Sequence, residues 1–305
     1  MNEAKFIMMV GPSYSGKSTL AEKIAKEQNG KVFSSDAIRA ELFGDANVQK
    51  NPQRVFDLLH KRVVKHLKEG GVAIYDATNL SCKRRMSFLR FLQNSKVQCE
   101  KEVVVVVASL ADINERRMTR ERVVPEEVVN RQLAQFQCPS YYEGWDKIIL
   151  RRTSDYNSCM KCFDMAMVVA ATMAHDNPHH TFNIGGHMQA AARYAKKKYT
   201  DISPELFLAV RYHDIGKVYT KQFKNSRGEP TEIAHFYGHQ GYGAYLILML
   251  DCPEEQLLRA SVIIQWHMEH YIRDEKAMKT LRDLLHKDGL DESLDIMHEC
   301  DKNAH

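Results

Sequence analysis

A glycine-rich loop near the start of the chain constrains the fold more than any other feature. Residues 11–18 read Gly-Pro-Ser-Tyr-Ser-Gly-Lys-Ser, between an apolar run at 5–10 and a helical stretch that continues to Glu27. Glycines here let backbone N–H groups turn toward phosphates, and the N-terminus of the following helix adds its dipole. This strand–loop–helix order predicts a phosphate-binding loop and disfavours the alternative, a glycine-rich turn that matches by chance. We expect the loop to bind a nucleotide through Gly11, Ser13, Ser15, Gly16, Lys17, Ser18 and Thr19.

Strands and helices alternate along the first half of the chain. Asn51-Pro52 opens a long helix whose apolar residues recur every fourth position. The valine-rich run that ends at Ala108 is apolar on both faces, which is typical of a central strand covered on both sides. The pattern predicts an α/β domain built on a doubly wound parallel sheet. The expected strands are residues 5–10, 31–34, 72–76, 102–108 and 147–151.

The chain changes character near residue 155. Thr153 to Ser158 is polar and linker-like, and beyond it the periodicity is helical almost to the end, without convincing strand alternation. Twelve of the 14 histidines follow this segment. We therefore expect an α/β domain at residues 1–155, followed by an all-α domain at residues 156–305.

Composition agrees with two soluble domains. The 305 residues are 44% hydrophobic and 27% charged, and no apolar run approaches the length of a membrane span. The N-terminus has no charged-then-apolar signal region, and the seven cysteines lack regular spacing, which favours a reducing compartment. Cys159-Met-Lys-Cys162 lacks the second pair that a zinc site needs, so we interpret it as two ordinary thiols. We expect a cytoplasmic protein with no membrane partner.

Two aspartates stand at the ends of expected strands. Asp36 lies at the carboxyl edge of the sheet, where the ligand crevice of open α/β folds lies, and could accept the proton of an attacking hydroxyl. A helix N-cap is the plainer interpretation of Asp36, and one residue can serve as both. Arg39 shares its helical face and could hold a substrate phosphate. Asp76 could support Mg²⁺ through water.

Two blocks of basic residues could hold phosphates, although either could also be a solvated helix face. The second block lies between helices, just before Pro125. A lid over ATP needs such a segment, because an arginine there neutralises charge on the transferred phosphoryl group. The blocks are Lys83, Arg84, Arg85 and Arg90, and Arg116, Arg117, Arg120 and Arg122.

Together these pieces resemble the kinase domain of the phage-type polynucleotide 5′-kinases over about residues 5–150. The resemblance rests on the phosphate loop, Asp36-x-x-Arg39, Asp76-Ala-Thr-Asn-Leu with Arg84-Arg85 behind it, and the arginine block. It implies that Lys17 and Ser18 bind ATP and Mg²⁺ and that Asp36 is the general base for a 5′-hydroxyl. Arg39 would hold the acceptor's phosphate. Arg120 would be the lid arginine, a role for which Arg116, Arg117 and Arg122 compete.

The second half carries metal-ligand residue types around His213-Asp214. An apolar helical run ends at this dipeptide, and Ile-Gly-Lys follows it. An adjacent imidazole and carboxylate can ligate one metal ion, and the aspartate can bridge to a second. A satisfied buried histidine remains the alternative for His239 and His267. The predicted metal ligands are His187, His213, Asp214, His239, His267 and Asp301.

Other histidines are assigned no metal. His175-Asp176 is a second His-Asp dipeptide, which lies before Asn-Pro in an expected loop and which we interpret as a decoy. The remaining candidates are expected at the surface or behind the ligands: His179, His180, His270 and His298.

The ligand set is similar to that of the HD metal-dependent phosphohydrolase superfamily, over about residues 158–305. The stretch from His213 to Met268 especially resembles the HD domains of bacterial tRNA nucleotidyltransferases. The resemblance implies one or two divalent transition-metal ions, with Asp214 at the catalytic centre.

The two resemblances imply a bifunctional enzyme that heals nucleic-acid ends. RNA is the polymer we expect, and the sequence leaves the choice between RNA and DNA open. The first half would transfer the γ-phosphate of ATP to a 5′-hydroxyl. The second would remove a 3′-phosphate or 2′,3′-cyclic phosphate, and a nucleic-acid ligase would be a partner. Two alternatives stay open: a small-molecule (nucleoside or sugar) kinase fused to an HD nucleotidase, and a kinase whose HD half is a regulatory module that only binds a nucleotide or RNA.

Overall fold

The computed structural model describes residues 4–120, 123–177 and 181–304. Two compact units make up the chain, and each is described by itself. The first combines Met1–Val107 with Glu143–Thr153, and the second combines Ala108–Tyr142 with Ser154–His305. The last crossing between the units falls at residues 153 and 154, two residues before the boundary expected from the sequence. The segment Ala108–Tyr142, which precedes that boundary, packs with the second unit.

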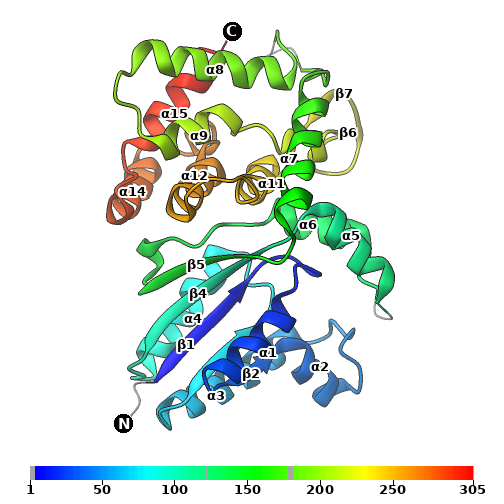
Figure 1. Ribbon diagram of the computed structural model, residues 1–305, viewed down its shortest axis with the longest axis vertical. Helices are drawn as coiled ribbons and strands as arrows, with labels where there is room; N and C mark the ends of the chain where they lie inside the picture. Colours follow the sequence, from blue (N-terminus) through cyan, green and yellow to red (C-terminus); the bar gives the residue numbers. More distant parts are fainter. Residues whose placement is uncertain (1–3, 121–122, 178–180, 305) are drawn as a thin grey trace. The chain divides into compact units, whose positions relative to one another are not determined.

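The first unit is built on a five-stranded parallel sheet in the order β2-β3-β1-β4-β5 (Figure 1). Met8 of β1 pairs with Tyr75 on one side and with Val103 on the other. The valines of β4 are buried, since this strand lies between β1 and β5 and both its faces are covered. The parallel α/β architecture predicted from the sequence is confirmed. The strands are β1 (Lys5–Val10), β2 (Lys31–Ser34), β3 (Val72–Asp76), β4 (Glu100–Val107) and β5 (Lys147–Arg152).

Four helices flank the sheet. The apolar stripe of the longest one is buried throughout, because its residues recur at i, i+4 and share one face. Phe6, Tyr75 and Phe88 form an aromatic layer with ring centroids 5.0–6.2 Å apart. The helices are α1 (Lys17–Glu27), α2 (Ser35–Phe43), α3 (Pro52–Lys68) and α4 (Cys82–Asn94).

The second unit is mainly helical, with α11 and α12 in contact at its centre. Residues of α11 are buried on every side, which is how a core helix differs from an amphipathic surface helix. Its α-helices are α5 (Leu110–Thr119), α6 (Glu126–Ala134), α7 (Tyr156–Ala170), α8 (Ile184–Lys198), α9 (Pro204–Tyr212), α10 (Lys217–Thr220), α11 (His239–Ile247), α12 (Glu254–Trp266), α13 (Glu269–Ile272), α14 (Glu275–Leu285) and α15 (Ser293–Lys302). Short 3₁₀ turns lie at Tyr141–Glu143 and His286–Asp288.

The expectation of an all-α second half is wrong in one place. Strands β6 (Gln222–Lys224) and β7 (Pro230–His235) pair as an antiparallel hairpin, with Gln222 opposite His235. Most residues of both strands are exposed, so neither shows the alternation of apolar and polar residues by which a half-buried strand is identified. Within the described ranges, no helix has both the length and the apolar composition needed to cross a membrane.

Candidate functional site

The glycine-rich loop connects β1 to α1, as predicted. Gly16 has a φ of 87°, a left-handed conformation that a side chain would strain. A Cβ on Gly11 would lie 2.5 Å from the carbonyl oxygen of Val106, so the loop depends on a glycine there too. The buried Lys17 ammonium donates to the Pro12 carbonyl at 2.5 Å and to Ser15 Oγ at 3.5 Å. Lys17 is thus folded back against the loop to which phosphates would bind.

Asp76 meets this loop at the end of β3. It is buried and accepts a hydrogen bond from Ser18, the residue expected to bind Mg²⁺. Burial raises the pKa of Asp76, while the positive charge of Lys17 and the Ser18 hydroxyl oppose the shift. Asn79, three residues later, donates to the Met9 carbonyl at 2.8 Å and so ties this strand end to β1. The structure therefore brings together the lysine, serine and aspartate that the sequence assigns to ATP and Mg²⁺.

Asp36 and Arg39 form an ion pair at 2.8 Å on α2. The N-cap of this helix is Ser34, whose hydroxyl accepts from the Asp36 amide at 3.3 Å. Asp36 is therefore not the cap, and its side chain is about half exposed at 48%. Arg39 is largely buried, with its guanidinium 6.0 Å from the ring of Phe56. Their roles as general base and phosphate ligand stay predictions.

The basic blocks separate into buried and exposed residues. Arg85 is neither a phosphate ligand nor part of a solvated face, because it is fully buried and pairs with Glu143 at 2.6 Å. In the second block, Arg117 pairs with Glu126 at 3.1 Å. Arg120 follows α5 in the second unit and is exposed, so its lid role stays a prediction. Arg122 lies outside the described residues.

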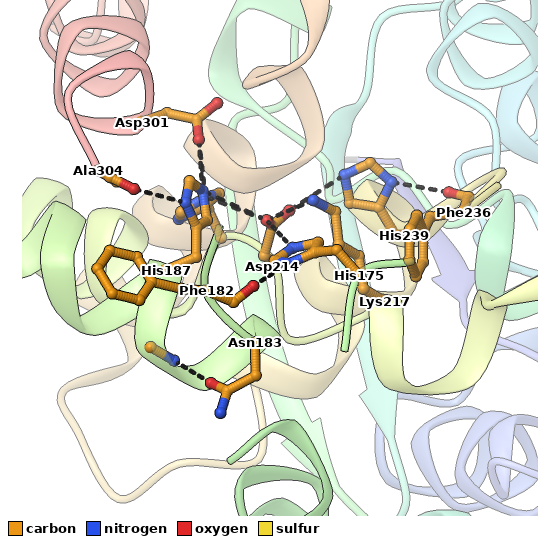
Figure 2. A network of polar contacts seen from close by, with 12 residues as sticks. His175, Phe182, Asn183, His187, Asp214, Lys217, Phe236, His239, Asp301 and Ala304 are labelled. Atoms are coloured by element: carbon orange, nitrogen blue, oxygen red, sulfur yellow. Dashed lines mark hydrogen bonds and ion pairs between the residues drawn. The ribbon is translucent and has the colours of Figure 1, made fainter. Parts of the chain in front are cut away.

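The second unit brings the six predicted metal ligands of this half together, with Asp214 between the others. Figure 2 shows four of them: His187, Asp214, His239 and Asp301. The six ligands come from α8, the turn after α9, the start of α11, the turn after α12, and α15. One set of nitrogen and carboxylate atoms that could share an ion is His187, His213 and Asp214, and the other is Asp214, His239 and His267. Asp214 belongs to both sets, as a bridging carboxylate must.

Distances within the cluster are short. His187 Nε2 lies 2.8 Å from Asp301 Oδ1 and 3.3 Å from His213 Nε2. On the other side of Asp214, the Nε2 atoms of His239 and His267 lie 3.4 and 3.8 Å from Oδ1. Each carboxylate oxygen of Asp214 therefore faces its own group of imidazoles.

The second ring nitrogen of each histidine is held by the main chain. Every Nδ1 of the cluster lies within hydrogen-bonding distance of a backbone carbonyl. A carbonyl can only accept, so each Nδ1 carries the proton, and in the neutral ring Nε2 presents its lone pair. Metal-binding histidines are oriented in this way by the groups behind them. The pairs are His175 with Phe182, His187 with Ala304, His213 with Val210, His239 with Phe236, and His267 with Ile264.

Charges in the cluster are strongly coupled. Burial would raise the pKa of Asp214, but the charges of Lys217 and His213 hold it well below its usual range. Burial lowers the pKa of His239 to about 3 and that of His267 to about 4. These two rings are consequently neutral at pH 7, the form that binds metals. The donor set fits divalent transition-metal ions, for which imidazole and carboxylate are suitable ligands.

His175, interpreted as a decoy, lies in the cluster. It is 2% exposed, and its Nε2 is 3.9 Å from Asp214 Oδ2. Lys217 is also buried there, with its ammonium 2.6 Å from the same oxygen (Figure 2). Among the residues that the structure describes, the segment around His175 is the expected loop, with an isolated bridge between Ala174 and Asn183. His175 nevertheless lies beside Asp214. The periodicity of the sequence does not predict this position, because tertiary packing sets it.

Close packing explains why a glycine, Gly216, follows His213-Asp214-Ile in the sequence. A Cβ at this position would lie 2.0 Å from the carbonyl oxygen of His239 and 2.6 Å from the amide nitrogen of Gly243. Only glycine lets the turn that carries Asp214 approach the first turn of α11 so closely.

Within the described ranges, His270, His298 and the cysteines belong to neither of the two ligand sets. His270 and His298 stack at 4.6 Å and are half-buried behind the cluster, where Tyr271 donates to Asp301 at 2.9 Å. His179 and His180 lie outside the described residues. Cys159 and Cys162 are free thiols.

Comparisons with known proteins give one family match and several similar structures. Residues 6–139 match the family described as "AAA domain". Comparison with curated proteins gives no match. A sugar kinase from Janibacter sp. HTCC2649 is 17% identical, over 49% of this chain and 85% of that one, with a TM-score of 0.37. A gluconokinase from Sinorhizobium meliloti 1021 is 18% identical, over 50% and 84%, with a TM-score of 0.35. In the Pnkp1/Rnl/Hen1 RNA repair complex, a chain is 22% identical over 44% of each chain, with a TM-score of 0.39.

The loop geometry and the family match agree. The sheet, the loop from Gly11 to Gly16, and Lys17 beside Asp76 identify a kinase-like P-loop domain within residues 6–139. Such a domain implies ATP and Mg²⁺ as ligands and indicates a phosphotransferase.

Proposed function

We propose that this chain heals nucleic-acid ends, with RNA as the substrate. Its P-loop half would phosphorylate a 5′-hydroxyl with ATP. Its helical half would be an HD-type phosphohydrolase that removes a 3′-phosphate or a 2′,3′-cyclic phosphate. The observation that carries the proposal is the convergence of buried imidazole Nε2 atoms on Asp214, in a chain that also has a phosphate-binding loop. Free thiols agree with a reducing cytoplasm.

In the kinase half, each side chain has one task. Lys17 would leave its contact with the Pro12 carbonyl to hold the β- and γ-phosphates, and Ser18 with Asp76 would hold Mg²⁺. Asp36 would accept the proton of the 5′-hydroxyl, which its exposed carboxylate can reach. Arg39 is held in place by a hydrogen bond to Ser35 on the same helix and would bind the acceptor's phosphate. Arg120 would be the lid arginine.

In the hydrolase half, one ion would be held by His187, His213 and Asp301, and another by His239 and His267, with Asp214 shared between them. Divalent ions there would polarise the phosphate ester and activate water. The carbonyls behind the rings fix the ligand tautomers, so no reorganisation is needed when substrate binds. Lys217 is buried beside Asp214 and would offer a positive charge to the terminal phosphate, whose phosphoryl group passes to water while the 3′-hydroxyl leaves.

The two activities would be complementary. A 5′-phosphate and a 3′-hydroxyl are the ends that a nucleic-acid ligase joins, so a ligase is the partner expected to consume the product. Ligation would also make the repair irreversible for both halves of this chain.

One oligonucleotide tests the proposal. An RNA with a 5′-hydroxyl and a 2′,3′-cyclic phosphate is incubated with ATP, Mg²⁺ and Mn²⁺ or Ni²⁺, and both ends are read. We expect phosphate to appear at the 5′ end and to leave the 3′ end. Asp36→Ala should abolish only the first change and Asp214→Ala only the second, while Asp283→Ala, at an exposed residue of α14, should alter neither.

Three results would overturn the proposal. An untouched oligonucleotide, with nucleosides or mononucleotides turned over in parallel, would indicate a small-molecule kinase joined to a nucleotidase. Loss of both activities in a folded Asp36→Ala or Asp214→Ala protein would contradict two independent sites. Metal bound at Asp214 without any hydrolysis would indicate a regulatory module.

A further inference from the structure

The β6–β7 hairpin is anchored next to the metal-ligand cluster. An isolated two-stranded hairpin is marginally stable, so it needs a partner. The Ala234 amide donates to the Asp176 carbonyl at 3.0 Å, and the Lys221 ammonium pairs with the Asp176 carboxylate at 2.5 Å. Asp176 follows His175, whose Nε2 faces Asp214. The hairpin is thus fixed to the segment that enters the cluster.

This hairpin exposes large apolar and aromatic side chains. Phe223 is 46% exposed, Ile233 44% and Tyr237, just after β7, 45%. Tyr237 lies flat against His235, with ring centroids 5.3 Å apart and planes only 6° from parallel. Of the stacked pair, Tyr237 is exposed and His235 is half-buried. An exposed aromatic ring is the kind of surface on which nucleobases stack.

The stacked pair leads directly to the metal ligands. Along the chain, Tyr237 lies two residues after His235 and two residues before His239. The Cα atoms of Tyr237 and His239 are therefore at most about 7.6 Å apart. Phe236 accepts the His239 Nδ1 hydrogen bond at 2.8 Å, and its ring centroid is 5.3 Å from the Lys217 ammonium (Figure 2). The exposed Tyr237 is therefore only two residues from a predicted metal ligand, His239.

Charges on the hairpin nearly balance. Lys224 and Arg227 are exposed at its turn, together with Glu229, whose carboxylate accepts from Asn225, and Glu232 on β7. Phosphate attraction is consequently weak here, and stacking must supply most of the affinity.

We infer that the hairpin and Tyr237 form a nucleobase-stacking platform, which holds the last bases of a single strand while its terminal phosphate reaches Asp214. The inference rests on the proposed function and extends it, because it makes a polymer end, rather than a free phosphate ester, the preferred substrate. Tyr237 and Phe223 would select the substrate without taking part in the chemistry.

The test compares two substrates in the full-length protein with Mn²⁺. One is an eight-nucleotide RNA with a 3′-phosphate, and the other is glycerol 2-phosphate, a small ester that has no ring to stack. We expect Tyr237→Ala to lower kcat/KM for the RNA about 5- to 150-fold and to leave the small ester unchanged. Tyr237→Phe keeps the ring and should behave as wild type. Tyr156→Ala, at a 58%-exposed tyrosine on α7, is the matched control.

A measurement of RNA binding distinguishes failure of this inference from failure of the proposed function. Fluorescence anisotropy with the same RNA, labelled at its 5′ end, needs no turnover. Weaker binding by Tyr237→Ala and Phe223→Ala, with little dependence on salt, supports the platform even if neither substrate is hydrolysed. Equal binding by wild type and both variants, or equal loss of activity on both substrates, overturns it. Hydrolysis of mononucleotides as fast as the RNA also overturns it.

Discussion

The Nε2 atoms of His239 and His267 lie 3.2 Å apart. Both rings use Nδ1 to donate to a carbonyl of the preceding residues, and both are neutral at pH 7 because burial lowers their pKa values to about 3 and about 4. Two neutral Nε2 atoms therefore present lone pairs to each other across a buried gap. That contact is unfavourable without a cation, and it supports a metal ion at this position.

Metal content tests this interpretation. We expect wild type to hold two divalent ions per chain and His267→Ala to hold one, with its affinity at the altered position reduced by more than about 100-fold. Asp214→Ala should hold none, since this residue is shared. The measurement is mass-spectrometric metal analysis after dialysis. His270→Ala, at a histidine outside both ligand sets, should keep two ions, and an unchanged content in His267→Ala would contradict the assignment.

Metal binding should release a proton from His213. Burial alone would lower the pKa of His213, but the carboxylates of Asp214 and Asp301 outweigh it and raise the pKa. An incoming ion must displace this proton, so metal affinity should rise with pH and level off above the raised pKa. Calorimetric titration in two buffers of different ionisation enthalpy counts the protons released. Absence of release at every pH from 6 to 9 would refute the protonated state of His213.

Gly216→Ala should disrupt the cluster. The added Cβ would meet backbone atoms of His239 and Gly243, which cannot rotate away, so the turn carrying Asp214 must move from α11. We expect loss of bound metal and a destabilisation of about 1–3 kcal/mol. Gly243→Ala is the graded control, because its nearest contact is 3.3 Å. Metal analysis and urea unfolding of both variants make the comparison, and full metal occupancy in Gly216→Ala would contradict the packing argument.

Arg85 should matter for stability and its neighbour Arg84 should not. Arg85→Ala leaves the buried Glu143 carboxylate without its partner, which costs about 3–5 kcal/mol. Arg84→Ala removes an exposed side chain of the same helix and should stay within about 0.5 kcal/mol. Urea unfolding measures both. Equal stabilities of the two variants would show that the ion pair is not maintained in solution.

His60 should make the first unit less stable in mild acid. Burial among aromatic rings lowers the pKa of His60 to about 4 from its usual 6.5. As pH falls, His60 is therefore protonated in the unfolded chain before it is protonated in the folded one. Its full contribution to the free energy of unfolding is present above pH 6.5 and is lost toward pH 4. With allowance for partial exposure, the loss is about 1–2 kcal/mol. His60→Phe should flatten this slope in thermal unfolding between pH 7 and 4. An unchanged slope would show that other groups cause it.

Much of the fold follows from local patterns. The five strands, the stripe on α3 and the loop before Lys17 are set by residues close in sequence, where side-chain periodicity and glycine placement act directly. The candidate metal ligands also follow from residue type, and the structure brings all six together.

Tertiary packing decided the rest. Arg85 and Arg84 are adjacent and chemically identical, yet Arg85 is buried against Glu143 and Arg84 is exposed. The position of each residue on the helix, and a partner in a 3₁₀ turn 58 residues away, determine the difference. His175 lies in a loop without periodicity and still reaches Asp214, and the β6–β7 hairpin pairs exposed strands that carry no alternation. Sequence alone determined which groups are available for chemistry. Which groups face one another depends on contacts between distant segments, and short-range patterns do not encode those contacts.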